Sequence, residues 1–449
     1  MTPPATIGLL FDRDFDAVEH ARLHAAGYRF ARAGFDLFRF PSQLALPGFD
    51  LTGFAQRIAR RARRGGWAAI VSHEEPFGAL AAALAARAAG LPGTDPAAVV
   101  ACQNKAVMRG VLARVAPEAN PRWAVLDLAA AAHGELPEGF GYPCFAKPVK
   151  AAFSVLARRL GSAHDLRALA RQQWRERLVA RWLAQPFDRA AARLQPQAGP
   201  TRRLLIEEPI HAPQYNLDGY VHRGEVRVLG VVDAVMVPGT QAFARWQLPS
   251  RLPAPVVVRA AELAGRFLRA VGFDHGFFNF EFFYEAASER LTAIEFNPRL
   301  ASQFSDLYRR VQGIDPHAMA IALACGEDPA ALPRVASTAP VAASLVWRAF
   351  DAASVPPPPR RAERAALART CPDALLLTFT KRGAALRRDF AWLESHRYGI
   401  VHLGADSWDA LAARCATAAA ALRWPNAPYA ESVVQLARGE GLAAGTRAA

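Results

Sequence analysis

Apolar and polar residues follow one another over the first hundred residues in a pattern that predicts short strands separated by helices. TIGLLF (6–11) and WAAIVS (67–72) are short apolar runs typical of buried strands, whereas residues 16–34 and 76–93 carry apolar side chains at helical spacing. Strands that alternate with helices favour a parallel sheet that is covered on both faces. We therefore predict an N-terminal parallel α/β domain over residues 1–102.

A second predicted unit, residues 103–203, begins with a helix near Gln103. GYPCFAKPV (141–149) and VLARRL (155–160) predict two partner strands, and an arginine-rich helical stretch follows and ends near Phe187. The segment QPQAGPTRR (195–203) is rich in proline, glycine and polar residues, so it predicts a loop that returns the chain to a strand, LLIEEPI (204–210).

Beyond this loop the pattern is mostly that of strands. Strands are predicted at 214–224, 225–235, 277–284 and 291–297, with a helix at 256–272. Proline-rich segments at 328–340 and 355–361 separate a last α/β portion, with a strand at 397–404 and a helix at 407–422. The four predicted domains are 1–102, 103–203, 204–330 and 331–449.

The composition is that of a soluble globular protein. The 449 residues suggest about three domains on length alone, and 52% of them are hydrophobic and 21% charged. No apolar run reaches the roughly 18 residues of a membrane span, and the first residues lack the basic segment of a secretion signal. The five cysteines have no paired spacing, which predicts neither a disulfide framework nor a zinc site. A reducing cytoplasm fits best, with no membrane partner.

The net charge of +14 is concentrated in one region. Residues 158–203 hold eleven arginines against three acidic residues. Arginines at helical spacing usually form a solvated helix face, although such a region could also attract an anionic ligand such as a nucleotide. No nucleic-acid-binding motif accompanies the charge, so nucleic-acid binding is disfavoured and the solvated face is preferred.

Residues 277–297 predict a hairpin that brings two carboxylates together. A turn centred near Ser288 places Glu281 opposite Glu295, and carboxylates about 5 Å apart across a strand pair repel each other. The same register pairs phenylalanines and an isoleucine on the other face: Phe280 with Phe296, and Phe282 with Ile294.

The motif IEFNPRL (294–300) adds an amide and a guanidinium to the same face. Glu295, Asn297 and Arg299 alternate with apolar or small residues. Mg²⁺ takes oxygen ligands, commonly carboxylates together with phosphate oxygens, so this face predicts a metal and anion site. The alternative is a hairpin whose polar face simply meets water.

Two lysines and an acidic segment extend this site. Lys147 ends a predicted strand, Lys105 opens a predicted helix, and either could be an ordinary surface lysine. The small-residue turn after Lys147 could bring backbone N–H groups and the Ser154 hydroxyl over phosphates. The strand LLIEEPI ends in two glutamates before a proline, where unpaired backbone groups could bind the edge of an adenine ring.

With these motifs in this order, the chain resembles the ATP-grasp superfamily, and more narrowly its carboxylate–amine ligases. The resemblance runs from IVSHEEPFGALAAALAARAAGLPG through NKAVMR, GYPCFAKPVKAAFS, LLIEEPIHAPQYNLDGYVHRG and VGFDHGFFNFEFF to IEFNPRLASQ. It implies an N-terminal α/β domain, an ATP-grasp domain of two subdomains, and a small C-terminal α/β portion.

The resemblance also implies roles for individual residues. The implied ATP-binding residues are Lys105, Lys147, Ser154, Glu207, Glu208, Ile210 and Gln214. The implied metal ligands, for Mg²⁺ or for Mn²⁺ in its place, are Glu281, Glu295 and Asn297, and Arg299 is the arginine near the transferred phosphoryl group. The sequence departs from relatives at Lys150–Phe153, where glycines are usual, at Gln214, where a ribose-binding glutamate is common, and in the long helical stretch 165–187.

The implied reaction is activation of a carboxylate by ATP, followed by attack of an amine on the acyl phosphate. Such chemistry requires positioning and charge neutralisation rather than a protein nucleophile. Asp218, Asp233 and His275 are candidates for the acceptor pocket, although for each of them the role of a structural polar residue is favoured. The alternatives are a non-catalytic nucleotide-binding module and a basic nucleic-acid binder. The substrates are left open, as is the oligomeric state, with a homodimer among the alternatives.

Overall fold

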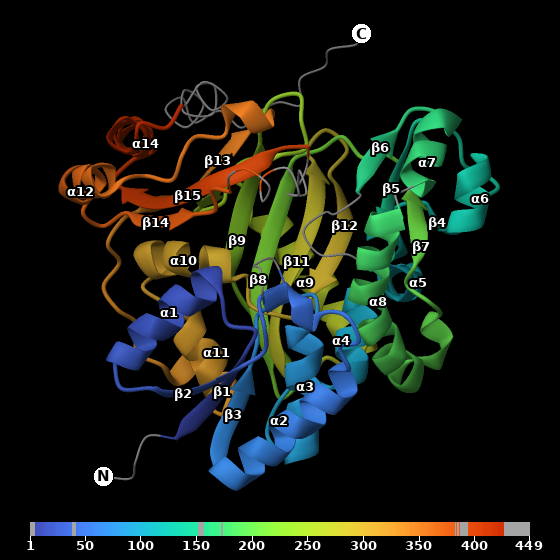
Figure 1. The fold of residues 1–449 in the computed structure, drawn as a ribbon, viewed down its shortest axis with the longest axis horizontal. Coiled ribbons are helices and arrows are strands. Elements are labelled where there is room, and N and C mark those ends of the chain that lie inside the picture. The colour runs from blue at the N-terminus through green and yellow to red at the C-terminus, as the bar shows by residue number, and fades with distance from the viewer. Residues whose placement is uncertain are drawn as a thin grey trace.

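Three β-sheets organise the molecule (Figure 1). The computed structural model describes residues 5–37, 42–150, 157–171, 174–381, 383, 386 and 394–425. The mixture of a parallel N-terminal sheet with antiparallel sheets after it agrees with the predicted fold class.

The N-terminal sheet is parallel, in the order β2-β1-β3. Its elements are β1 (Thr6–Leu10), α1 (Asp14–Ala25), β2 (Arg29–Ala33), α2 (Leu51–Gly65), β3 (Trp67–Val71), α3 (Gly78–Ala89) and α4 (Pro96–Gln103). Apolar side chains of α2 and α3 pack with Leu10 and Ile70 of the sheet. Leu23 of α1 and Ile321 of α11 (Pro316–Ala324) pack with Ile7 and other sheet residues. Helices therefore cover this sheet as predicted.

The helix predicted at 16–34 is wrong in its second half. Helix α1 ends at Ala25, Gly27 has a positive φ of 102°, and residues 29–33 form strand β2. Glycine adopts this backbone conformation without a Cβ penalty, so the chain can turn there. Strand β2 is only partly buried and lacks a strand-like apolar alternation, which explains why the pattern did not reveal it.

The second sheet is antiparallel, in the order β4-β7-β5-β6. Its strands are β4 (Trp123–Asp127), β5 (Cys144–Pro148), β6 (Arg158–Leu160) and β7 (Arg203–Glu207). The helices of this region are α5 (Lys105–Val115), α6 (Leu128–His133), α7 (Ala163–Ala170) and α8 (Trp174–Leu194). The predicted pairing of β5 with β6 is confirmed, and the arginine-rich stretch forms the two helices α7 and α8.

The third sheet is antiparallel and has the order β12-β11-β8-β9-β10-β13-β15-β14. Its strands are β8 (Gln214–His222), β9 (Glu225–Met236), β10 (Phe243–Leu248), β11 (Gly276–Glu285), β12 (Arg290–Asn297), β13 (Val341–Ala349), β14 (Leu375–Thr378) and β15 (His396–Ala405). The associated helices are α9 (Ala254–Ala270), α10 (Ser305–Gln312), α12 (Arg361–Thr370) and α14 (Trp408–Leu422), besides α11. The C-terminal strands thus continue the sheet that contains the β11–β12 hairpin, and the fourfold domain division stays a proposal.

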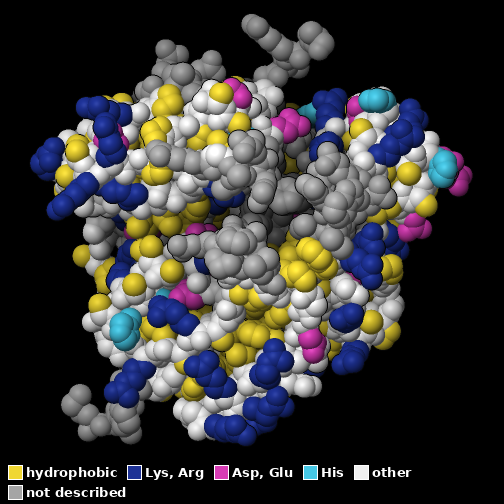
Figure 2. Space-filling view, in the orientation of Figure 1, with side chains coloured by type: hydrophobic (Ala, Val, Ile, Leu, Met, Phe, Trp, Pro, Cys, Tyr) yellow, Lys and Arg dark blue, Asp and Glu magenta, His cyan; other side chains and the backbone are white. Residues whose placement is uncertain are grey.

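Basic side chains lie over several elements of the surface. Figure 2 shows Lys and Arg over α2, over α12 and α14, and on the side of α7 and α8, and not as one continuous stripe. On α2, Arg57, Arg60, Arg61 and Arg64 surround a depression beside Trp67. Among the described residues, no helix has the length and apolar character required to cross a membrane.

Candidate active site

The β11–β12 hairpin has the predicted register at its carboxylates. Glu281 pairs with Glu295, and Phe280 pairs with Phe296. The predicted pairing of Phe282 with Ile294 is wrong, because a β-bulge follows Glu281 and Phe282 pairs with Ala293. One strand carries an extra residue between the carboxylate pair and the turn, and a bulge absorbs such a residue.

The carboxylates are held by a lysine and by amides. The Lys105 ammonium lies 2.9 Å from Glu295 Oε2. Gln214 Nε2 donates to Glu281 Oε2 at 2.9 Å, and Asn297 Nδ2 donates to Glu281 Oε1 at 3.2 Å. Lys105, Gln214 and Asn297, far apart along the chain, therefore converge on Glu281 and Glu295.

The two carboxylates have opposite pKa shifts. Burial, reinforced by the charge of Glu295, raises the pKa of Glu281 to about 8. Burial also acts to raise the pKa of Glu295, but the Lys105 ammonium outweighs it, and the pKa falls to about 2. The surroundings of Glu281 therefore do not fully stabilise its charged form, and a bound cation would supply the missing positive charge.

The residues present fit a hard divalent cation. Glu281, Glu295 and Asn297 offer carboxylate and amide oxygens on one face of a strand pair, which is the ligand type that Mg²⁺ prefers. Asn297 is now oriented with its amide nitrogen toward Glu281 and toward Asn279 Oδ1, which lies 3.1 Å away. An amide rotation would present its oxygen instead.

Lys147 and Glu207 form a buried ion pair beside this hairpin. Lys147 Nζ lies 2.9 Å from Glu207 Oε2, and Arg109 Nε donates to Glu207 Oε1 at 2.7 Å. Burial lowers the pKa of Lys147, and the neighbouring Glu207 only partly offsets this. The predicted strand end at Lys147 and helix start at Lys105 are both confirmed.

Arg109 and Lys147 also donate hydrogen bonds to backbone carbonyl groups next to the bulge. Arg109 Nη1 donates to Ala293 O at 2.8 Å, Arg109 Nη2 to Ile294 O at 3.2 Å, and Lys147 Nζ to Ile294 O at 3.4 Å. Strand β12 is the edge of its sheet, so these carbonyls need partners from outside the sheet. Arg109 and Lys147 thereby tie β12 to Glu207 of the neighbouring sheet.

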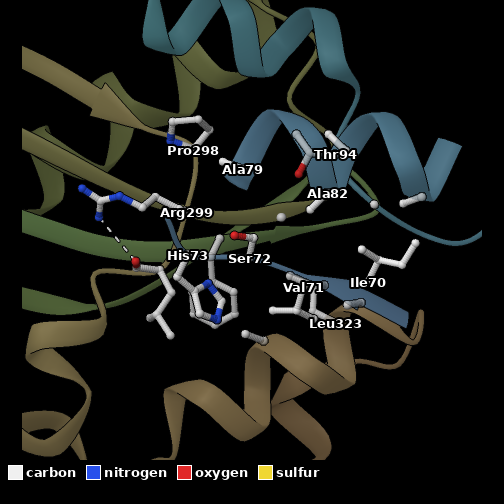
Figure 3. A pocket seen from close by; sticks show the side chains of 18 of the residues that line it. Ile70, Val71, Ser72, His73, Ala79, Ala82, Thr94, Pro298, Arg299 and Leu323 are labelled. Carbon is white, nitrogen blue, oxygen red and sulfur yellow. Dashed lines mark hydrogen bonds between the residues drawn. The ribbon is translucent and has the colours of Figure 1, made fainter. Parts of the chain in front are cut away.

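Arg299 is anchored by Glu75, which lies between β3 and α3. Its Nη2 donates to Glu75 Oε2 at 2.9 Å. The carbonyl of Glu75 accepts from Lys150 Nζ at 3.4 Å, so Glu75 contacts both the arginine and the segment after Lys147. Figure 3 shows Arg299 and His73 close together at the end of β3.

A cavity of about 410 Å³ lies over these residues. Its lining includes the polar residues Glu75, Gln214, Asn279, Glu281, Glu295 and Arg299. It also includes aromatic side chains, namely Phe15, Phe243, Trp246, Phe304 and Phe379, and the cations Arg13, Arg348, Lys381 and Arg397. The cavity thus combines an acidic, metal-compatible part with aromatic and basic parts.

The other predicted ATP-binding residues lie at the end of β7 or outside the described residues. Glu208 and Ile210 follow β7 and are partly buried, and Glu208 Oε1 accepts from Arg290 Nη2 at 2.6 Å. The Glu208 backbone N–H is already bonded to Arg122 O at 3.1 Å. Ser154 falls outside the described residues.

The three predicted acceptor-pocket residues lie apart from the cavity lining. Asp233 accepts from Gln247, Ser250 and the Arg251 backbone N–H. The ring of His275 lies against Leu323 O, with Nε2 at 2.7 Å, in a smaller pocket beside the N-terminal sheet. Asp218 is buried and accepts hydrogen bonds from Asn279 and Tyr308.

We expect Asp218 to make stability depend on pH. Burial, against its two hydrogen bonds, raises its pKa from 3.8 to about 7. The pKa is higher in the folded state than in the unfolded state. The contribution of Asp218 to the free energy of unfolding is therefore fully present below the unfolded-state pKa of 3.8 and is lost as pH rises through about 7. Asp218→Asn should remove that loss, which is on the order of a few kcal/mol. Urea unfolding at about pH 5 and about pH 8 measures it. Asp274→Asn, at an exposed aspartate, is the control and should keep the wild-type dependence of unfolding free energy on pH. If Asp218→Asn also keeps that dependence, Asp218 is not its source.

Four residues of the site were not predicted to have a role. Glu75, Arg109 and Asn279 contact the predicted residues directly, and Lys150 was noted only as a departure from a glycine-rich loop. Asn279 had a usable signal, since it lies two residues before Glu281 on the same strand face. No sequence signal pointed to Glu75 or Arg109, because their partners are distant in sequence.

Comparison with known proteins identifies an ATP-grasp domain in residues 140–306. The predicted membership of the ATP-grasp superfamily is therefore confirmed for this part of the chain, which holds Lys147, Glu207, Glu281, Glu295 and Arg299. A search of curated protein sequences found no match.

Solved structures share the fold over nearly the whole chain. An L-amino acid ligase from Bacillus licheniformis has a TM-score of 0.67 at 14% identity, covering 93% of this chain and 98% of that one. An N5-carboxyaminoimidazole synthetase from Staphylococcus aureus, complexed with ADP, has a TM-score of 0.60 at 12% identity, covering 96% and 98%. A biotin carboxylase from Campylobacter jejuni has a TM-score of 0.57 at 16% identity, covering 93% and 91%. At these identities the likeness establishes the fold.

Proposed function

We propose that this protein is an ATP-dependent ligase that activates a carboxylate as an acyl phosphate and joins it to an amine. The observation that carries the proposal is that Glu281, Glu295 and Arg299 line one cavity of a chain with an ATP-grasp domain, and that Lys105 is paired with Glu295. The solved structures of similar fold include an L-amino acid ligase and an enzyme crystallised with ADP.

Each residue has a role that its surroundings support. Lys105 and Lys147 neutralise ATP phosphates, and both are buried ammonium groups that now have carboxylate partners to exchange for phosphate. Glu281, Glu295 and Asn297 hold Mg²⁺, which supplies neutralisation of phosphate charge when bound. Arg299 stabilises charge on the transferring phosphoryl group, and Glu75 orients it.

The reaction proceeds through two displacements. A carboxylate oxygen of the first substrate takes the terminal phosphoryl group from ATP, and ADP leaves. The neutral amine then attacks the acyl carbon, the C–N bond forms, and phosphate leaves with the bonding electron pair and takes up the proton that the amine nitrogen releases. Positioning and charge neutralisation are sufficient for both steps, so no protein nucleophile is needed.

The remaining cavity lining favours an anionic substrate with an apolar portion. Phe15, Trp246 and Phe304 supply apolar surface, while Arg13 and Arg397 supply positive charge on the same cavity. A carboxylate with an aliphatic or aromatic side chain matches both features.

A non-catalytic ATP-binding module is the second candidate. The complete set of Glu281, Glu295, Asn297 and Arg299 favours turnover over this alternative. The discriminating experiment incubates the protein with ATP, Mg²⁺ and a panel of carboxylates, with hydroxylamine to trap an acyl phosphate. Carboxylate-dependent release of ADP with formation of a hydroxamate supports the ligase. ATP binding without either product, over a panel that includes amino acids and aromatic acids, supports the binding module.

Replacing Lys147 with alanine should weaken ATP binding at least about tenfold, since it removes a charge-assisted contact of roughly 1.5 to 3 kcal/mol. The fold should survive because Glu207 keeps its bond to Arg109. Calorimetric titration of ATP measures the effect, and Arg171→Ala, at an exposed arginine after α7, is the matched control. Wild-type affinity in a folded Lys147→Ala protein would remove Lys147 from the ATP site.

A further inference from the structure

Three histidines from distant parts of the chain meet beside the N-terminal sheet. His20 lies on α1, His73 lies just after β3, and His317 lies on α11. The ring centroids of His20 and His73 each lie 5.3 Å from that of His317 and 6.2 Å from each other. One nitrogen of each ring lies within 4.8 Å of those of the other two.

Two aspartates fix the orientation of two of these rings. Asp12 Oδ1 lies 2.9 Å from His20 Nδ1, and Asp16 Oδ1 lies 2.9 Å from His317 Nε2. A carboxylate can only accept, so each of these nitrogens carries the hydrogen, and the other nitrogen of a neutral ring keeps its lone pair. Carboxylates hold metal-ligating histidines in this way.

Three ring nitrogens of the cluster are buried and have no hydrogen-bond partner among the described residues. They are His20 Nε2, His317 Nδ1 and His73 Nε2, and none has appreciable contact with solvent. A buried polar atom without a partner costs free energy, and here three such atoms belong to one cluster. A ligand that accepts lone pairs would satisfy all three atoms at once.

We propose that His20, His73 and His317 bind a divalent transition-metal ion of the zinc class, oriented by Asp12 and Asp16. Imidazole nitrogen suits Zn²⁺, Co²⁺, Ni²⁺ and Cu²⁺, whereas Mg²⁺ prefers oxygen, so this ion differs from the one expected with ATP. In a tetrahedral zinc site the nitrogens lie about 2 Å from the ion, so each ring would move inward by at most about 1 Å from separations that are within 4.8 Å.

The position of the cluster predicts two effects of ion binding, one on the stability of the fold and one on access to the ion from the cavity. Its three ligands join α1 and the end of β3 to α11, so binding should stabilise the packing of α11 on the N-terminal sheet. A four-coordinate ion also needs a fourth ligand. His73 and Asp16 both line the central cavity, so a water molecule or a substrate atom would reach the ion from that side.

The test uses full-length protein with any affinity tag removed and metal stripped by a chelator. Titration with Co²⁺ should produce the visible absorption of a tetrahedral cobalt site, saturating at one ion per chain, and Zn²⁺ should abolish it. Zn²⁺ should also raise the melting temperature, and excess Mg²⁺ should not displace the cobalt. If the titration gives no absorption band and Zn²⁺ gives no shift in melting temperature, the proposal is overturned, and the three nitrogens would then surround water.

Variants locate the ion. His73→Ala, at the least buried of the three, and His317→Ala should abolish the cobalt band, whereas His24→Ala should not. His24 is an exposed histidine of the same helix as His20, and its Nδ1 faces Tyr28 O. Asp16→Asn should weaken cobalt binding about 10- to 100-fold while keeping the band. A band that persists unchanged in His73→Ala overturns the site even if His317→Ala fails to fold. Binding of Mg-ATP is measured separately, because its loss bears on the ligase proposal alone.

Discussion

Glu281→Gln is expected to reduce ATP turnover by at least about a hundredfold, because it removes a metal ligand that neutralises phosphate charge. It should at the same time leave the ligand-free protein as stable as the wild type, or more stable. Burial and the charge of Glu295 raise the pKa of Glu281 to about 8, so near pH 7 the ligand-free side chain is mostly neutral and neutral glutamine replaces it without loss of a charge. Shape is conserved, and Gln214 and Asn297 remain as neighbours.

The measurements are thermal melts with and without Mg-ATP, together with ADP release on a carboxylate that the trapping experiment identifies. Glu285→Gln, at the exposed end of the same strand, is the matched control and should behave as wild type. Glu295→Gln should lose turnover equally but should destabilise the ligand-free protein, because it also removes the partner of Lys105. A Glu281→Gln protein that is strongly destabilised yet turns over normally would identify the pair as a structural network.

The β11–β12 hairpin shows which features of the site the sequence pattern predicts and which it does not. Alternation of apolar and polar residues predicted that Glu281 faces Glu295, since a one-residue slip would have reversed the faces of the strand. The bulge next to it could not be predicted, because it depends on where the turn absorbs an extra residue. That bulge places the carbonyls of Ala293 and Ile294 before Arg109.

Contacts between distant segments are the part of the site that the sequence did not reveal. Glu75 and Arg299 are 224 residues apart, and Arg109 and Glu207 are 98 residues apart. No periodicity connects such pairs, because it is the packing of elements far apart in the sequence that brings them together. The same holds for His20, His73 and His317, whose spacing matches no metal-binding motif.

The order of the motifs along the chain was more informative than any one of them. A lysine at a strand end is ordinary, but Lys105, Lys147 and the hairpin carboxylates in this succession predicted an ATP-grasp domain, and residues 140–306 contain one. The roles of the individual residues remain proposals that the variants test.

Arg109→Leu is expected to destabilise the protein by roughly 3 to 5 kcal/mol, as loss of one partner from a buried ionic network does. Arg109 is 1% exposed and joins three parts of the chain from its place on α5. Its Nε binds Glu207, and its Nη groups bind the carbonyls of Ala293 and Ile294. Leucine fills part of the volume but leaves Glu207 Oε1 and Ala293 O without their Arg109 donor, while Lys147 still contacts Glu207 Oε2 and Ile294 O.

Urea unfolding measures this loss as a lower midpoint with an unchanged slope. Arg114→Leu is the matched control, since Arg114 is exposed on the same helix and bonds only to Gly110 O among the described contacts. Glu207→Gln added to Arg109→Leu should recover part of the loss if the charge of Glu207, left with Lys147 alone, causes it, and none if the two carbonyls dominate. Because Arg109 holds β12 against β7, the surviving folded fraction of Arg109→Leu should also bind Mg-ATP more weakly. Wild-type stability in Arg109→Leu would mean that water or Lys147 replaces all three bonds, and that Arg109 does not fix the position of the carboxylate hairpin.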